Sequence, residues 1–263
     1  GEVFTVGSDT LITWEGIAPT DTVSLEFSAD NGETWKLLTT KATGLKYSWQ
    51  NVPMPPSAKC LVRVKQEGKE PIGTSPTIEW QRSLGGSGYD AAFSIQQSTD
   101  SGYIVAGYST SNDGDVTTNQ GIYDYWVVKL SPVGALEWQI PLGGSKEDWA
   151  QSIQQCTDGG YIVAGFSGSK DGDVSGNHGD TDFWVVKLSP LSTIEWQTSL
   201  GGDWGEAAYS IQQSTDGGYI VAGYSQINNG DVTGNQGMND FWVVKLSHLG
   251  DIEWQKSLGG SED

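Results

Sequence analysis

Residues 195–252 read EWQTSLGGDWGEAAYSIQQSTDGGYIVAGYSQINNGDVTGNQGMNDFWVVKLSHLGDI, and this stretch decides the fold because the chain contains three similar copies of it. The tripeptide Glu-Trp-Gln begins at positions 79, 137, 195 and 253, so its spacing is constant and no copy has an insertion or deletion. Across the copies 79–136, 137–194 and 195–252, 32 of the 58 columns are identical, and a fourth copy begins at residue 253. Repeats of this length are typical of stacked or radial sheet units, none of which buries its apolar faces alone.

Each repeat is predicted to form four antiparallel strands. In the first copy, apolar residues alternate with polar ones between Gly- and Asp-rich turns, which predicts strands over Ala91–Ser98, Tyr103–Ser109, Tyr125–Leu130 and Leu136–Leu142. The polar segment Thr110–Asp124 is predicted to be a loop. Four such strands per repeat favour an all-β fold made of β-propeller blades. A three-fold β-prism or an enlarged β-trefoil is the alternative.

The segment before the repeats, 1–77, does not follow their pattern, so we place a domain boundary there and expect domains at 1–77 and 78–263. Short strands are expected at Thr10–Trp14, Val23–Ser28, Thr34–Leu38, Tyr47–Gln50 and Cys60–Lys65. Short strands separated by turn signals suggest a β-sandwich. The segment Ser28–Trp35 also matches an Asp-box pattern, which we interpret as a structural hairpin turn with Asn31-Gly32 at its tip.

Two resemblances to known families refine this picture. The runs Gly7–Trp14, Ser28–Trp35, Tyr47–Trp49 and Cys60–Val64 resemble immunoglobulin-like modules of secreted bacterial surface proteins. The repeat motifs resemble the seven-bladed β-propeller repeat family of secreted bacterial and archaeal proteins; they are Leu84–Ser87 with Asp90–Ala92, Gly102–Tyr108 and Asp124–Pro132. These resemblances imply a secreted or cell-surface protein.

The repeat region departs from that family in two ways. Three blades leave the ring incomplete, and the region both begins and ends with a fourth strand, at Thr77–Leu84 and Ile252–Leu258. A self-closing propeller would use one terminal strand to complete the blade of the other. We therefore expect either further blades outside this chain or exposed sheet faces that meet another subunit.

Composition excludes several kinds of partner. The formal net charge of −19 disfavours nucleic acids and anionic membranes as ligands, and no stretch approaches the roughly 20 apolar residues of a spanning helix. The sequence has no initiator Met and no signal peptide, so we expect a processed or partial chain. Cys60 and Cys156 lie in different predicted domains, and a disulfide between them is left open.

The repeats are not predicted to be an enzyme. His178 and His248 are the only histidines, neither recurs in the other copies, and both are interpreted as solvated loop residues. Nearly identical repeats also lack the different groups that converge in a catalytic site. The recurring pairs Lys129–Glu137, Lys187–Glu195 and Lys245–Glu253 are predicted to be cross-strand ion pairs, and Gln96-Gln97, Gln154-Gln155 and Gln212-Gln213 to be structural amides of the first strands.

Two sets of residues are candidates for ligand binding. The loop after each second strand holds oxygen-bearing side chains around a glycine, a pattern that suits Ca²⁺, although simple Asx turns explain the same residues. The candidate metal ligands are Asp113, Asp115, Asn119 and Asp124 in copy one, Asp171, Asp173, Asn177 and Asp182 in copy two, and Asn229, Asp231, Asn235 and Asp240 in copy three. Trp149 and Trp204 occupy positions without a counterpart in the other copies, so they could stack on sugar rings or pack against a neighbouring blade or subunit.

The sequence therefore predicts a secreted, non-enzymatic structural or surface protein that serves as a scaffold or assembly subunit of a filament, sheath or cell-surface layer. A carbohydrate-binding or adhesion module, with Ca²⁺ as a stabilising ion, is the alternative. A propeller hydrolase or lyase is a third hypothesis, which would need an acid/base set supplied by blades outside this chain.

Overall fold

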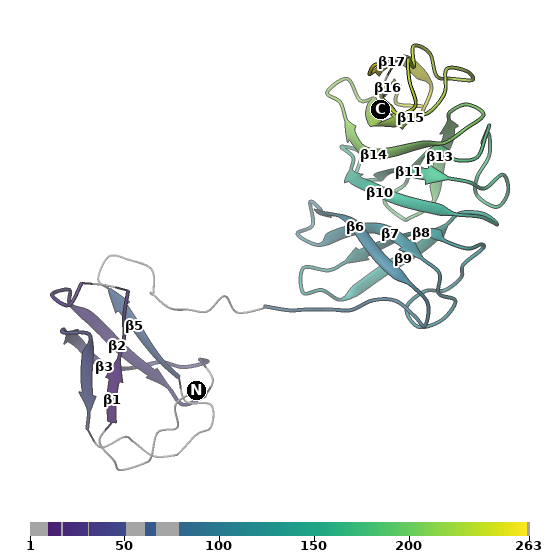
Figure 1. Ribbon diagram of the computed structural model, residues 1–263. Coiled ribbons are helices and arrows are strands. Elements are labelled where there is room, and N and C mark those ends of the chain that lie inside the picture. The colour runs from purple at the N-terminus through teal and green to yellow at the C-terminus, as the bar shows by residue number, and fades with distance from the viewer. Residues whose placement is uncertain (1–9, 17, 31, 51–60, 67–78, 262–263) are drawn as a thin grey trace. The chain divides into compact units, whose positions relative to one another are not determined.

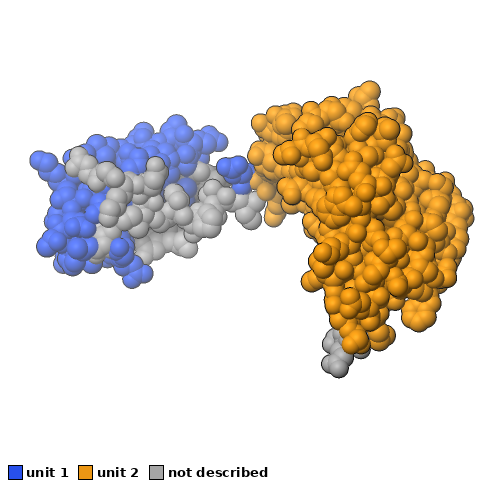
Figure 2. Space-filling model, turned by 90° about the horizontal axis from the view of Figure 1, so that it is seen from above, with its two compact units in different colours: residues 1–79 blue, residues 80–263 orange. Residues whose placement is uncertain are grey.

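The computed structural model describes residues 10–16, 18–30, 32–50, 61–66 and 79–261. Every regular element in these residues is a β-strand, which confirms the all-β prediction (Figure 1). Contacts divide the chain into two compact units, residues 1–79 and 80–263 (Figure 2). In the described part of the chain no helix is long and apolar enough to cross a membrane.

The described residues of the first unit form two small antiparallel sheets. Strand β1 (Thr10–Thr13) pairs with β4 (Lys46–Trp49), and the second sheet has the order β3 (Lys36–Ala42), β2 (Val23–Ser28), β5 (Leu61–Gln66). Apolar residues of both sheets, Ile12 and Trp49 among them, are buried in its core. Strand β3 starts at Lys36, later than predicted, because Thr34 belongs to the preceding turn.

That turn is the Asp-box segment, and its structural interpretation is confirmed for the described residues. Asp30 accepts a hydrogen bond from the Thr34 amide at 2.8 Å, and the Trp35 indole donates to the Gly32 carbonyl at 2.9 Å. Gly32 has a φ of 94°, a left-handed conformation that glycine adopts without strain. Asn31 and Cys60 lie outside the described residues, and Cys156 is a free, buried thiol.

The second unit contains three four-stranded antiparallel sheets, one for each repeat, and each sheet follows chain order. Strand positions within the repeat agree closely with the prediction. The strands are β6 (Asp90–Gln97), β7 (Tyr103–Ser109), β8 (Asp124–Leu130) and β9 (Leu136–Leu142); β10 (Asp148–Gln155), β11 (Tyr161–Ser167), β12 (Asp182–Leu188) and β13 (Ile194–Leu200); and β14 (Glu206–Gln213), β15 (Tyr219–Ser225), β16 (Asp240–Leu246) and β17 (Ile252–Leu258).

The three sheets pack face to face in sequence order (Figure 1). We call the face that a sheet turns toward the following repeat its forward face, and the opposite one its rear face. Forward faces carry Ile104, Ala106, Tyr125 and Val127 in the first sheet and Ile162, Ala164, Phe183 and Val185 in the second. Rear faces carry Ile153, Val163, Trp184 and Val186 in the second sheet and Ile211, Val221, Trp242 and Val244 in the third. Alternate residues of each strand thus fill two different cores, as expected for a sheet that is covered on both sides.

A buried aromatic pair lies at the centre of each internal junction. The ring of Tyr125 lies 4.5 Å from that of Trp184, and the ring of Phe183 lies 4.6 Å from that of Trp242. Tyr125, Phe183 and both tryptophans are completely buried. Pairs at this separation add to the free energy of area burial, so each junction has an aromatic centre.

The first strands of adjacent sheets are joined by hydrogen bonds. The Gln155 amide donates to Gln96 Oε1 and the Gln213 amide to Gln154 Oε1, both at 2.6 Å. The Ile153 amide donates to the Ser94 hydroxyl at 3.2 Å in the same way. The side chains of Gln155 and Gln213 in turn accept from the amides of Thr99 and Thr157 in the preceding repeat. The paired glutamines are therefore structural, as predicted, although their side chains bind backbone amides of neighbouring repeats and not one another.

The predicted lysine ion pairs are also confirmed, and they are more buried than a surface pair. Lys187 Nζ lies 2.9 Å from both Glu195 Oε2 and Asp158 Oδ2, with 3% of its side chain exposed. A bulge shifts the register, so that Lys187 is opposite Trp196 and not Glu195. The partner aspartate in the first turn was not predicted, because it belongs to the turn between β10 and β11, far from Lys187 in sequence.

Candidate functional site

The loops that were predicted to bind calcium form hydrogen bonds to the Gly-Gly turn (the corner) that precedes the first strand of each sheet. In the first repeat, Asp113 Oδ1 accepts a hydrogen bond from the Ser87 amide at 2.7 Å, and Asp115 Oδ2 accepts one from the Gly85 amide at 3.2 Å. Asn119 Nδ2 donates to the Ser109 carbonyl at 2.7 Å. Counterparts of these bonds recur in the later copies at Asp171, Asp173, Asn177, Asn229, Asp231 and Asn235.

The last acidic residue of each loop begins the third strand and is buried. Asp124 Oδ2 accepts a hydrogen bond from the Gln120 amide at 2.5 Å, and Asp182 and Asp240 accept the matching bond in their own repeats. Among the described residues, no three His, Cys, Asp or Glu side chains form a group that could hold a metal ion. The Ca²⁺ assignment therefore stays a prediction.

Carboxylates from adjacent repeats approach one another at the corner. A Cβ atom at Gly143 would lie 2.6 Å from Asp148 Oδ2 and 2.7 Å from Asp124 Oδ1, so both carboxylates face this glycine. Burial raises the pKa of Asp124 to about 6, with the charges of Asp148 and Asp173 adding to the effect. Burial also raises the pKa of Asp148. Sequence reasoning did not single out Asp148, because only the packing of two repeats brings it to Asp124.

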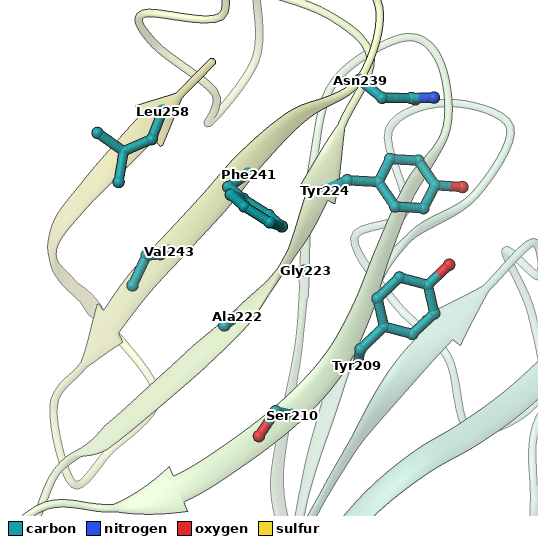
Figure 3. A pocket seen from close by; sticks show the side chains of 9 residues that line it. All are labelled: Tyr209, Ser210, Ala222, Gly223, Tyr224, Asn239, Phe241, Val243 and Leu258. Atoms are coloured by element: carbon teal, nitrogen blue, oxygen red, sulfur yellow. The ribbon is translucent and has the colours of Figure 1, made fainter. Parts of the chain in front are cut away.

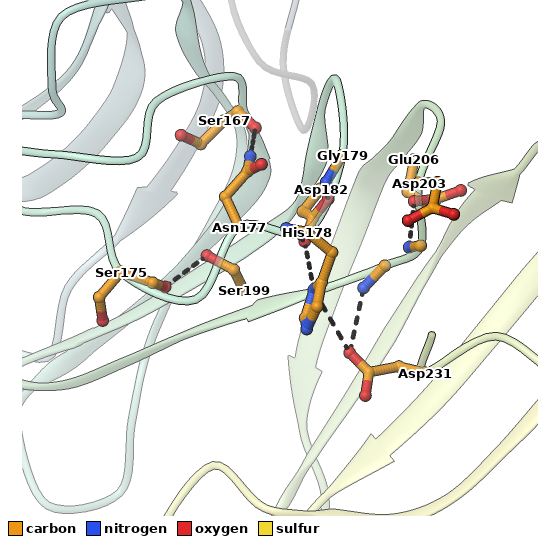
Figure 4. A network of polar contacts seen from close by, with 12 residues as sticks. Ser167, Ser175, Asn177, His178, Gly179, Asp182, Ser199, Asp203, Glu206 and Asp231 are labelled. Atoms are coloured by element: carbon orange, nitrogen blue, oxygen red, sulfur yellow. Dashed lines mark hydrogen bonds and ion pairs between the residues drawn. The ribbon is translucent and has the colours of Figure 1, made fainter. Parts of the chain in front are cut away.

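His178 is part of the corresponding site between repeats two and three (Figure 4). Its Nδ1 lies 2.8 Å from Asp182 Oδ2 and 3.9 Å from Asp231 Oδ2. His178 is an exposed loop residue, as predicted, with 41% of its side chain accessible, but the contact of its ring with the buried Asp182 was not predicted. Gln120, its counterpart in the first repeat, donates to Asp173 at 2.8 Å, so both residues join a loop to the next repeat.

The two candidate ligand-binding tryptophans have different surroundings. The ring of Trp149 lies 4.5 Å from that of Tyr108, 5.2 Å from that of Tyr123 and 5.7 Å from that of Phe166. Trp149 therefore packs between the first and second repeats. Trp204 is 57% exposed and has no described aromatic neighbour, which leaves its ring open to solvent.

The forward face of the third sheet is an apolar surface that no described residue covers (Figure 3). It forms an open pocket of about 700 Å³ lined by Tyr209, Ser210, Ala222, Gly223, Tyr224, Asn239, Phe241, Val243 and Leu258. Figure 3 shows the rings of Phe241, Tyr224 and Tyr209 on this side of the sheet. Phe241 is 73% exposed, whereas its counterparts Tyr125 and Phe183 are completely buried under the tryptophan of the next sheet.

The rear face of the first sheet is the complementary surface. It carries Trp126, the counterpart of Trp184 and Trp242, together with Ile95, which is 62% exposed. A pocket of about 520 Å³ lies over this face. Trp80 and Leu84 cover part of it, packing against the core formed by Trp126 and its neighbours. Trp126 itself is only 6% exposed, so this rear face is partly covered, whereas the forward face of the third sheet is open. The two faces correspond to the two halves of the junction that the inner repeats form.

Comparison with known proteins does not assign this chain to a family. A scan against protein-family models found no match, and a search of curated proteins found no similar sequence. Function is therefore inferred from the residues and the geometry of the chain itself.

Proposed function

We propose that this chain is a non-enzymatic extracellular structural protein, an assembly subunit of a filament, sheath or cell-surface layer. In this proposal the repeat sheets are β-propeller-type blades and the first unit is an immunoglobulin-like module. The observation that carries the proposal is the exposure of Phe241 at a position that the two inner junctions bury.

The energetics favour covering the open faces. Burying one phenylalanine side chain contributes about 1.5–3 kcal/mol, and Phe241 shares its face with Tyr224, Val243 and Leu258. An apolar surface of this kind, on a chain that otherwise carries 33 acidic residues, marks an interaction site. Because the third sheet offers a forward face and the first sheet a rear face, association is head to tail and forms either rings or open filaments.

Molar mass in solution tests the proposal. Size-exclusion chromatography with light scattering should give multiples of the 28.2 kDa chain mass that increase with concentration. Phe241→Asp should return the chain to a monomer. Leu191→Asp is the matched control, since Leu191 is also an exposed apolar residue, in the β12–β13 turn, but lies outside both faces. A monomer at every concentration of the unaltered chain would rule out the assembly function.

The extracellular location is supported by the resemblance of the repeats and of the first unit to secreted proteins. The absence of a predicted catalytic set in nearly identical repeats supports a building role over an enzymatic one. Limited protease treatment of intact source cells tests the location, because a surface protein is cleaved and an internal one is protected.

A carbohydrate-binding or adhesion function is the second candidate, and the exposed ring of Trp204 favours it. Exposed indole rings provide a flat apolar surface on which a sugar ring can stack. A glycan array tests this function with Trp204→Ala as the variant. Trp149→Ala is the less suitable variant, since Trp149 supports the junction between the first two repeats. Array binding that survives Trp204→Ala would exclude Trp204 as the sugar contact.

A further inference from the structure

Residues 79–84 have the sequence of a fourth strand but no strand partner. They read Glu-Trp-Gln-Arg-Ser-Leu, and residues 253–258 in β17 read Glu-Trp-Gln-Lys-Ser-Leu, so the two segments differ only at Arg82. Strands β9, β13 and β17 pair with the third strand of their own sheet, whereas residues 80–84 belong to no sheet. The prediction of a strand over Thr77–Leu84 was therefore wrong for its described residues, because no described strand pairs with them.

This segment nevertheless occupies the place of a fourth strand against the first repeat. The ring of Trp80 lies 5.6 Å from that of Tyr103, and the rings of Trp138 and Tyr161 have the same separation at the next junction. Gly86 donates its amide to Asp90 at 2.9 Å, as Gly144 does to Asp148 at 2.8 Å. Residues 80–86 therefore lie on the first sheet as β9 and its corner lie on the second.

In head-to-tail docking, two segments of nearly identical sequence, residues 79–84 and β17, would compete for the same position. If the forward face of one copy covered the rear face of another as the inner sheets do, Trp254 of β17 would take the position over Tyr103. That position already holds Trp80. Both tryptophans cannot occupy it, so one of the two segments must leave its place.

We propose that residues 79–84 of one copy replace β17 and pair with β16 of a second copy of this chain. This strand exchange rests on the proposed self-association and specifies its partner. Trp254 is 50% exposed and has no described aromatic neighbour, whereas Trp80 and Leu84 are already half-buried in the first core. The segment that gives way is therefore β17, and the strand that enters matches it at every position except Arg82.

The register of the exchange follows from the existing sheets. In β17, Lys256 is opposite Val243 and Ser257 is opposite Trp242. Arg82 and Ser83 take these two positions. In β9, Pro141 stands at the position of Ser83, opposite Trp126. Proline has no amide hydrogen, so this position does not donate to the ladder, and in an antiparallel pair the neighbouring position does. The Arg82 amide is thus required for pairing, and the Ser83 amide is not.

Two proline variants of the full chain test the proposal. Arg82→Pro removes the hydrogen bond to β16 of the second copy, and we expect it to abolish the oligomer in light scattering. Ser83→Pro is the matched control and should assemble like the unaltered chain. Both residues are exposed in the single chain and belong to no sheet, so the monomers should unfold at the same temperature as the unaltered protein.

The outcomes separate strand exchange from self-association. If the unaltered chain is always monomeric, both proposals fail. If Arg82→Pro assembles normally, or if both variants lose assembly equally, self-association stands and the exchange is wrong. Hydrogen exchange of the unaltered oligomer gives a second measurement that needs no variant: amides of residues 80–84 should exchange on the order of tenfold more slowly than in the monomer, and those of β17 faster. Unchanged protection of both segments would overturn the exchange.

Discussion

Truncating the same aromatic position should destabilise the chain much more in the second repeat, at Phe183, than in the third, at Phe241. Phe183 and Phe241 are the same position of the repeat, opposite Leu200 and Leu258 in the fourth strand. Phe183 is completely buried and its ring lies 4.6 Å from that of Trp242, whereas Phe241 is 73% exposed. The sequence context is nearly identical, so the comparison isolates the covering sheet.

The magnitude follows from burial. Phe183→Ala removes a ring from a close-packed core and should destabilise the repeat unit by about 3–5 kcal/mol, since truncation of a buried phenylalanine loses transfer free energy and leaves a cavity. Phe241→Ala removes a ring that water already reaches, and its cost in the monomer should be below about 1 kcal/mol. The two variants should therefore differ by at least about 2 kcal/mol.

Urea unfolding provides the assay. Tryptophan fluorescence reports mainly on the repeat unit, which holds nine of the twelve tryptophans. Each sample is diluted until light scattering gives the 28.2 kDa monomer mass, so that association does not contribute. A difference below about 1 kcal/mol would refute the packing of Phe183 under Trp242. An equally large cost for Phe241→Ala would show that the forward face of the third sheet is covered within the single chain.

Four further perturbations test contacts within and between the repeats. Burial raises the pKa of Asp124 to about 6 from its ordinary 3.8, so the folded chain binds more protons and Asp124 alone should lower stability by up to about 3 kcal/mol as pH rises from 4 to 6; Asp124→Asn should remove this contribution in pH-dependent melting and leave those of Asp148, Asp182 and Glu206, whose pKa values burial also raises. Lys187→Met should cost about 1–3 kcal/mol in urea unfolding, because Asp158 and Glu195 lose their shared cation. Gly165→Ala should cost at least about 2 kcal/mol in the same assay, since its Cβ would overlap the Trp149 carbonyl oxygen. Calcium at millimolar concentration should raise the melting temperature above that in chelator if the acidic loops bind it, and an unchanged value would refute the Ca²⁺ prediction.

The local structure of the repeat was encoded in its sequence. Alternating apolar residues and Gly-Asp turns placed β7 and β9 at their observed bounds, because side-chain periodicity and turn chemistry act over a few residues. The ion pair of Lys187 with Glu195 was also predicted, although a bulge places Lys187 opposite Trp196 and not opposite Glu195. Near-identity of the copies also indicated that each sheet would bury its faces against the next.

Contacts between residues far apart in the sequence could not be predicted from it. Asp158 and Lys187 are separated in sequence by all of β11 and the loop after it, and Asp124 and Asp148 belong to different repeats, so neither contact has a local pattern. Trp149 illustrates the same limit: both packing and ligand binding were consistent with its position in the sequence, and only the rings around it show that it packs.

Only the tertiary structure decided which copies of the Glu-Trp-Gln segment form a paired strand. The sequence determined that residues 79–84 and 253–258 can both form a fourth strand, because they have nearly the same side chains. Strand pairing, however, needs hydrogen-bond partners on a neighbouring chain segment. Residues 253–258 have such a partner in β16, and residues 80–84 have none in the described sheets. The exposure of Phe241 has the same origin: a residue is buried by what lies opposite it, and its own sequence does not contain that surface.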